Sequence, residues 1–184
     1  MAIETPEYTV LRKVKNIEIR KYQEYIQAEV EVVEEDYKSA IEKGFGILAG
    51  YIFGNNISKQ KINMTSPVKA ETSERVPMTS PVKVSGNGKY IIAFVMPKKY
   101  SIDTLPEPFN KAIHFKKIDP HRIAAVRFSG FFNQQNIEKN ITILKEWLNK
   151  ENIKTEGEYV IAGYNPPWVP WFLARNEAMI QIKE

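Results

Sequence analysis

The chain has 184 residues, an ordinary share of apolar and charged residues and a formal net charge of +4. This length is typical of one folded domain with its own core. The sequence contains no cysteine, which excludes disulfides, thiolate zinc sites, iron–sulfur clusters and thiol nucleophiles. Its first residues lack a basic start and an apolar run, and no apolar stretch reaches bilayer length. We therefore expect a cytoplasmic protein without a membrane partner, and a monomer by default.

The first elements in chain order are two strands and a helix. Apolar residues alternate over residues 17–22 and again over residues 26–33, which indicates strands. The short link between them suggests that the two strands form a hairpin. Asp36 is a suitable N-cap for a helix over residues 37–53, because the following apolar residues recur at helical spacing and end at a glycine.

The next elements are strands marked by a repeated hexapeptide. MTSPVK occurs at residues 64–69 and again at residues 78–83. Each copy predicts a strand at a sheet edge or a bulge, because its proline removes one backbone donor. A type I′ turn at Asn87 and Gly88 then leads into an apolar strand over residues 90–96.

The second part of the sequence repeats this plan. It predicts strands at 113–118 and 123–128 joined by a turn, a helix at 134–150, and closing strands at 158–164 and 178–182. A constant offset superimposes the helix faces, aligning Ala40, Gly44, Ile47 and Tyr51 with Ile137, Ile141, Leu144 and Leu148.

These elements predict an α+β fold in which two pseudo-symmetric repeats form a distorted antiparallel β-barrel, or two curved sheets, flanked by two helices. The repeats cover about residues 8–97 and 111–184, and the first has an extra strand from the doubled hexapeptide. Because neither half covers its own amphipathic surface, we expect one domain over residues 1–184.

A proline-rich stretch with large aromatic side chains stands out near the C-terminus. Its prolines exclude a helix or a central strand, so residues 165–174 form a stiff loop. The loop carries Trp168, Val169 and Trp171, and leaving such side chains in water forfeits about 1.5 to 3 kcal/mol each. Either the loop folds over the core of the protein, or its inner side faces a flat apolar ligand.

The first predicted helix contains three glycines, at Gly44, Gly46 and Gly50. Each costs around 1 kcal/mol relative to alanine inside a helix. Their bare backbone allows the close approach of a strand, or of a planar ligand beside Phe45 and Ala49.

Several segments together resemble the SOUL family of haem-binding proteins. They follow the order of the family over nearly the whole chain: IEIRKY (17–22), GFGILAGYIFGNN (44–56), INMTSPV (62–68), FVMP (94–97), LPEPFN (105–110), VRFSGF (126–131), and AGYNPPW (162–168) with RNE (175–177). The resemblance implies a distorted antiparallel barrel with two helices, and binding of haem or another tetrapyrrole without a known reaction.

The resemblance also implies where the ligand lies. By position, the family's site falls on Phe45 and Ala49 of the first helix and on Trp168 and Val169 of the loop, with Trp171 beside them. Arg175, Lys21 and Lys43 are candidate partners for the propionates. Some members of the family have a histidine within the segment 19–22, where this chain has Lys21.

Axial ligation of the iron has few candidates. His114 alternates with apolar neighbours and so faces away from their side, and His121 follows a turn, so we expect both at the surface. Met64 and Met78 are expected to fill the core rather than bind iron, although Met64 stays within the candidate site. We therefore predict mainly hydrophobic binding with weak or absent coordination.

The sequence contains no phosphate-binding loop, nucleophile elbow or HExxH motif, so we do not expect an enzyme. The two-repeat architecture also resembles effector-binding domains of gyrase-inhibitor-like proteins. In that alternative the protein binds, or even hydrolyses, lipophilic and often cationic small molecules at a buried Glu177 or Glu158. Nucleic acid is not an expected partner, because the aromatic residues are not interleaved with a basic stripe.

Overall fold

A computed structural model describes residues 5–63, 65–66, 68–72, 88–131, 133–165 and 169–183. Within them the strands and helices are β1 (Tyr8–Val14), β2 (Ile17–Tyr22), β3 (Tyr25–Glu34), α1 (Tyr37–Ile52), β4 (Val68–Thr72), β5 (Gly88–Val95), β6 (Ile113–Ile118), β7 (His121–Phe128), α2 (Gln134–Lys150), β8 (Thr155–Gly163) and β9 (Asn176–Ile182). A single 3₁₀ turn, Ile102–Thr104, interrupts the loop before β6.

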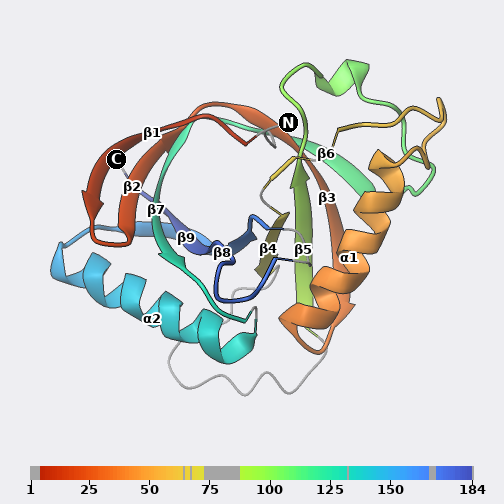
Figure 1. Ribbon diagram of the computed structural model, residues 1–184. Coiled ribbons are helices and arrows are strands. Elements are labelled where there is room, and N and C mark those ends of the chain that lie inside the picture. The colour runs from red at the N-terminus through yellow and green to blue at the C-terminus, as the bar shows by residue number, and fades with distance from the viewer. Residues whose placement is uncertain are drawn as a thin grey trace.

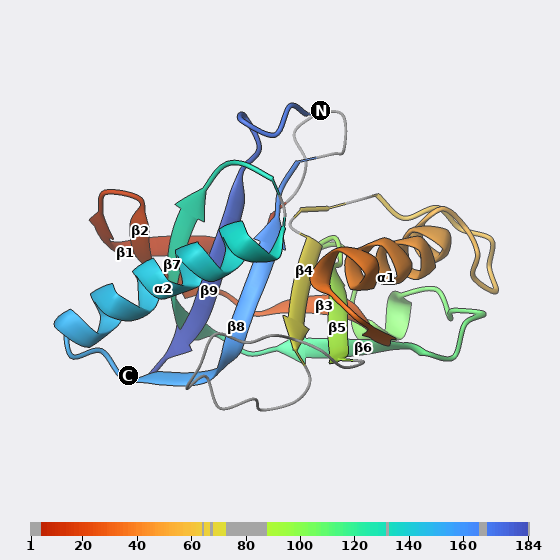
Figure 2. The same cartoon turned by 90° about the horizontal axis from the view of Figure 1, so that it is seen from below.

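The strands form one antiparallel sheet in the order β1-β2-β7-β9-β8-β4-β5-β3-β6. Pairing of β4 with β8, from Val68 opposite Gly163 to Glu71 opposite Val160, joins the two halves. Figure 1 shows that the sheet is strongly curved and that both helices lie on its outer side. Seen from below, α1 covers one half and α2 the other (Figure 2). The predicted fold class is confirmed, with one continuous, unclosed sheet in place of two separate ones.

The hairpins predicted over residues 17–33 and 113–128 are wrong, although their strands are right, while the predicted closing pair of strands is confirmed as β8 and β9. β2 pairs with β1 and β7, while β3 pairs with β5 and β6. Tyr22 lies opposite His121 and Tyr25 opposite Ile118, so the two chain segments run side by side across the bend of the sheet. The link Gln23-Glu24 contains neither glycine nor asparagine, which a tight hairpin turn requires. The chain therefore continues past the bend instead of reversing.

The extra strand is β1, which the alternation pattern did not reveal. Its side chains are half-buried or exposed along the whole strand, so they carry no clear apolar face. β1 pairs with β2 through a turn at Lys15, whose φ is 54°. The strand predicted from the first hexapeptide begins only at Val68 and lies between β8 and β5, so its predicted edge position is wrong. The second copy and Asn87 of the predicted turn lie outside the described residues.

Both helices are confirmed to within one residue. In α1 the Asp36 carboxylate accepts a hydrogen bond from the Ser39 N–H at 2.9 Å, and Gly54 follows the helix with a φ of 109°. In α2 the Asn133 side chain caps the helix in the same way through the Asn136 N–H. Neither helix of the described residues is long and apolar enough to span a bilayer.

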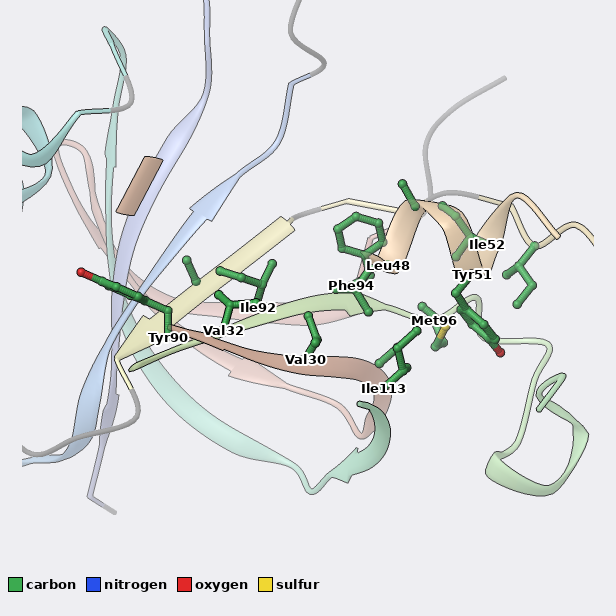
Figure 3. Close-up of a cluster of buried hydrophobic side chains, with 14 of the residues drawn as sticks. Val30, Val32, Leu48, Tyr51, Ile52, Tyr90, Ile92, Phe94, Met96 and Ile113 are labelled. Atoms are coloured by element: carbon green, nitrogen blue, oxygen red, sulfur yellow. The ribbon is translucent and has the colours of Figure 1, made fainter. Parts of the chain in front are cut away.

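Each helix packs its apolar face on one half of the sheet. In Figure 3, Leu48, Tyr51 and Ile52 of α1 face Phe94 of β5 and Met96, which follows β5. α2 covers the other half with Ile137, Ile141, Leu144 and Leu148, the positions that the offset of the repeats predicted. Tyr22, Ile123, Ala125, Ala162 and Met179 form a separate buried cluster.

The close approach of α1 to the sheet depends on one of its three glycines. A Cβ atom at Gly44 would lie 2.4 Å from Cγ1 and 2.6 Å from Cβ of Ile92. Gly46 has no heavy atom within 4 Å of the same position, and Gly50 has only the Asn55 amide nitrogen at 3.9 Å. Strand packing therefore accounts for Gly44, while Gly46 and Gly50 leave open space on the helix.

This difference gives a matched pair of substitutions. Gly44→Ala should lower the free energy of unfolding by about 1 to 3 kcal/mol, because the added methyl group overpacks the core against Ile92. Gly46→Ala should raise the free energy of unfolding by up to about 1 kcal/mol, because alanine favours the helix and its Cβ atom has no heavy atom within 4 Å. Urea unfolding of both variants measures the two values, and equal effects would contradict the packing described for Gly44.

Candidate functional site

The outer surface of α1 carries a thin apolar strip made of Phe45, Gly46, Ala49, Gly50 and Phe53. Gly46 is exposed and Gly50 half-buried, so the helix backbone is uncovered at the centre of the strip. The Phe45 ring packs edge-on against Phe94 at 5.2 Å, and Ala49 is buried, which anchors one side of the strip in the core. The Phe53 ring is 62% exposed at the helix end. Apolar residues that stay uncovered on a helix are a candidate binding surface.

The equivalent surface of α2 is different. The same offset that aligns the buried faces places Ile143 opposite Gly46 and Trp147 opposite Gly50. Charged residues follow at Glu146 and Lys150, which correspond to Ala49 and Phe53. The uncharged strip with its uncovered helix backbone is therefore specific to α1 and is not a consequence of the repeated architecture.

The C-terminal loop places its described aromatic residues beside the start of α2. The Trp171 ring stacks on Phe131 at 4.8 Å and meets Phe172 edge-on at 5.5 Å. The Gly130 N–H donates to the Trp171 carbonyl oxygen at 2.9 Å, which ties this part of the loop to the segment between β7 and α2. Val169 is half-buried, while Trp168 and Met64 lie outside the described residues.

The base of the same loop is held by a buried charge cluster centred on Glu177. Nη1 and Nη2 of Arg20 donate to the two carboxylate oxygens of Glu177 at 2.6 and 2.8 Å. Arg175 donates to Oε1 at 2.8 and 3.1 Å, and the Tyr164 hydroxyl donates to Oε2 at 2.7 Å. Glu177 is fully buried and Arg20 is 2% exposed. These contacts occupy both carboxylate oxygens.

The electrostatics of the cluster keep Glu177 ionised. Burial by itself raises the pKa of Glu177, but hydrogen bonds and the charge of Arg20, with help from Tyr164 and Arg175, lower this pKa below its ordinary value of 4.5. Burial and the neighbouring carboxylate raise the pKa of Tyr164. Two guanidinium groups thus surround one carboxylate, while Glu18 pairs with Arg20 from its other side at 2.8 Å.

Sequence reasoning named Glu177 but missed its partner Arg20. The sequence pattern does point to Arg20, because Arg20 and Tyr22 alternate with the apolar residues Ile17 and Ile19. They therefore share the opposite face of β2. A charged residue on that face has to find a partner if the face is buried. The sequence does not reveal that the face is buried or that the partner lies 157 residues away.

Of the remaining candidate residues, Lys43 shares α1 with the strip, while Lys21 and His114 lie on the sheet. Lys21 is exposed on β2, which belongs to the half of the sheet covered by α2. Lys43 on α1 forms an ion pair with Glu34 at 2.6 Å. His114 is exposed on β6 and faces away from the buried Ile113, as predicted.

His121 differs from its prediction as a surface residue of a turn. It begins β7 and is half-buried, and its ring stacks on Tyr22 at 5.6 Å. Pairing of β7 with β2 draws it onto the inner face of the sheet. Among the described residues no group of three His, Cys, Asp or Glu side chains could hold a metal ion.

Comparison with known families identifies the class of protein. The family model described as "SOUL heme-binding protein" matches residues 3–181, so the chain belongs to this family of haem-binding proteins. Heme-binding protein 2 of Homo sapiens is 29% identical over 168 residues, which cover 87% of this chain and 78% of the human protein.

Comparison with solved structures supports the fold. The C-terminal domain of EcmrR superimposes with a TM-score of 0.69 at 10% identity, covering 96% of this chain and 98% of that one. SAV2435 bound to tetraphenylphosphonium superimposes with a TM-score of 0.51 at 10% identity, covering 96% and 94%. At such identities these similarities concern the fold alone.

Glu177→Gln tests the charge cluster. At neutral pH the substitution leaves two buried or half-buried guanidinium groups without their carboxylate, and should cost about 3 to 5 kcal/mol of unfolding free energy. Since the pKa of Glu177 is lower in the fold than in the unfolded chain, its contribution is complete above pH 4.5 and is lost as the pH falls further. The stability difference between wild type and variant should therefore shrink in acid.

Urea unfolding between neutral pH and about pH 3 measures this difference. Glu158→Gln is the matched control, because within the described residues Glu158 has no ion pair, and it should change stability by less than about 0.5 kcal/mol. If Glu177→Gln does not fold, Tyr164→Phe replaces it and should cost about 1 kcal/mol through one lost hydrogen bond. A stability difference independent of pH would contradict the assigned role of Glu177.

Proposed function

We propose that the protein binds haem or a related tetrapyrrole without catalysing a reaction, and that the ligand lies on the apolar strip of α1. The face of the macrocycle rests on the exposed backbone at Gly46 and Gly50, between the side chains of Phe45 and Phe53. In this proposal the other wall comes from the proline-rich loop at Trp168 and Val169, while Trp171 stacks on Phe131 beside α2. Membership of the haem-binding family supports the class of ligand.

The observation that carries this location is the absence of side chains at Gly46 and Gly50. A planar ligand needs a flat apolar surface, and the uncovered helix backbone supplies one that the second helix, with Ile143 and Trp147, does not have. Helical glycines at exposed positions are also unfavourable for the isolated helix, by about 1 kcal/mol each. Ligand binding explains why glycine occupies positions 46 and 50, whereas packing within the protein does not explain it.

Binding is mainly hydrophobic in this proposal. His114 is exposed on the face of β6 opposite Ile113, and Ile113 is the residue of this pair that packs in the cluster under α1. His121 lies on β7, in the other half of the sheet, and stacks on Tyr22. In this proposal neither histidine coordinates the iron. Haem, when bound, supplies the redox and ligand chemistry of its iron, while the chain supplies the apolar surface and excludes water. Lys43, at the edge of α1, is the cation nearest in sequence to the strip for a propionate, in exchange for its exposed pair with Glu34.

Gly46→Leu tests the location. A leucine side chain occupies the open space above the helix and should weaken haem binding by at least about tenfold, the effect of some 1.4 kcal/mol. Thr142→Leu adds the same side chain to the exposed surface of α2 and should leave haem affinity unchanged. Titration of haem followed by Soret absorbance measures both affinities. Equal affinities for the two variants would show that the ligand does not lie on α1.

Removal of the iron tests the mode of binding. Metal-free protoporphyrin presents the same flat surface and the same propionates, so it should bind within about threefold of haem when coordination contributes little. Quenching of tryptophan fluorescence measures both ligands on one scale. A loss of a hundredfold or more without iron would show that the chain coordinates the metal.

The effector-type alternative needs a carboxylate that can meet a cation. Glu177 does not meet this need, because Arg20, Arg175 and Tyr164 occupy both of its oxygens. Glu158, the other acid considered, lines the inner face of the sheet at a distance from the strip on α1. The charge arrangement at Glu177 therefore argues against a lipophilic cation at that carboxylate.

A further inference from the structure

The inner face of the curved sheet contains a cavity of about 210 Å³. Strands from both halves line it, and both helices lie on the opposite face of the sheet (Figure 1). The strip on α1 and this cavity are thus separated by the sheet itself. The volume is below the range of about 300 to 1,000 Å³ typical of drug-sized ligands, so it does not admit a tetrapyrrole.

One wall of the cavity is aromatic. The rings of Tyr25 and His121 are 6.1 Å apart, and Tyr22 lies 6.2 and 5.6 Å from them. Tyr22 is buried and fixes the other two rings, which are only half-buried. Ala93, Val160 and Met179 complete an apolar floor. Flat aromatic rings pack well on such surfaces through stacked or edge-on contacts.

Several polar groups of the lining are hydrogen-bond acceptors. Gln27 is 9% exposed, and its Oε1 has no hydrogen-bond partner among the described residues, while its Nε2 donates to Glu29 at 2.8 Å. His121 must donate from Nδ1, because its partner at 2.7 Å is the Asp119 carbonyl oxygen. In the neutral ring Nε2 is then an acceptor, and burial lowers the pKa of His121 and so favours this neutral form.

Two carboxylates add to these acceptors. Glu156 and Glu158 line the cavity, and neither forms an ion pair within the described part of the chain. They flank Gly157, whose φ of 76° accompanies an irregularity in the pairing of β8 with β9. Irregularities of this kind redirect side chains next to binding sites. The two lysines of the lining have partners, since Lys69 donates to the Tyr25 hydroxyl at 2.6 Å and Lys116 pairs with Glu29 at 3.8 Å.

We propose that this cavity is a second ligand site, which takes a one- or two-ring aromatic molecule carrying N–H donors. The ring stacks on Tyr25 and His121, and the donors meet the acceptor of Gln27 and the neighbouring carboxylates. Size agrees with this class, because an apolar cavity of about 150 Å³ is already large enough for benzene. An unsatisfied buried acceptor is costly, so a ligand that satisfies Gln27 gains from it.

The test compares indole, which has one N–H donor, with 1-methylindole, which has none. Protein NMR titration of the full chain with each compound gives both the affinity and the location. Indole should shift the resonances of Tyr25, Gln27 and His121 and bind about three- to tenfold more tightly than 1-methylindole, the effect of one hydrogen bond. Gln27→Met should remove this preference, and Gln135→Met on the exposed surface of α2 should retain it.

Three results would overturn the proposal. They are the absence of any shift at millimolar indole, shifts confined to α1 or the C-terminal loop, and equal affinity for the two compounds in the wild type. Haem titration of Gln27→Met separates the two sites, because the variant should bind haem normally even where indole binding is altered. Failure of the α1 site therefore leaves the cavity testable, and the reverse also holds.

Discussion

The buried ion pair between Arg20 and Glu177 constrains the arrangement of the whole second half of the sheet. Arg20 on β2 reaches Glu177 on β9 across β7, where the small side chain of Ala125 occupies the same inner face. Because a buried charge without its partner costs several kcal/mol, the strands cannot slip relative to one another. Tyr164 and Arg175, at the two ends of the C-terminal loop, bind the same carboxylate, so the loop is fixed at its base by this one residue.

The two faces of the sheet differ in chemical character. The outer face is apolar and supports two helices, of which only α1 has an uncovered, uncharged strip. The inner face combines aromatic rings with charged side chains and with the Gln27 amide oxygen, which has no hydrogen-bond partner among the described residues. A hydrophobic macrocycle suits the first surface and a small polar ring the second. Curvature of the sheet makes this division possible, since it hollows one face while it exposes the other to the helices.

The candidate site was partly predictable. The glycines at 44, 46 and 50 indicated a close approach, and the structure divides them into one that serves packing and two that remain open. The sequence does not separate these cases, because the difference depends on whether Ile92 lies beneath a given turn of the helix. The aromatic loop was recognised from its prolines, but the stacking of Trp171 on Phe131 joins residues 40 positions apart and has no local signature.

The sequence by itself determined the helices, most of the strands and the repeat, because caps and apolar periodicity act within a few residues. It also placed His114 on the exposed face of its strand by alternation alone. Only the tertiary structure decided which strands pair, that Arg20 meets Glu177, and that an inner cavity exists. These features depend on contacts between residues far apart in the chain, and alternation shows that a face is buried without showing what covers it.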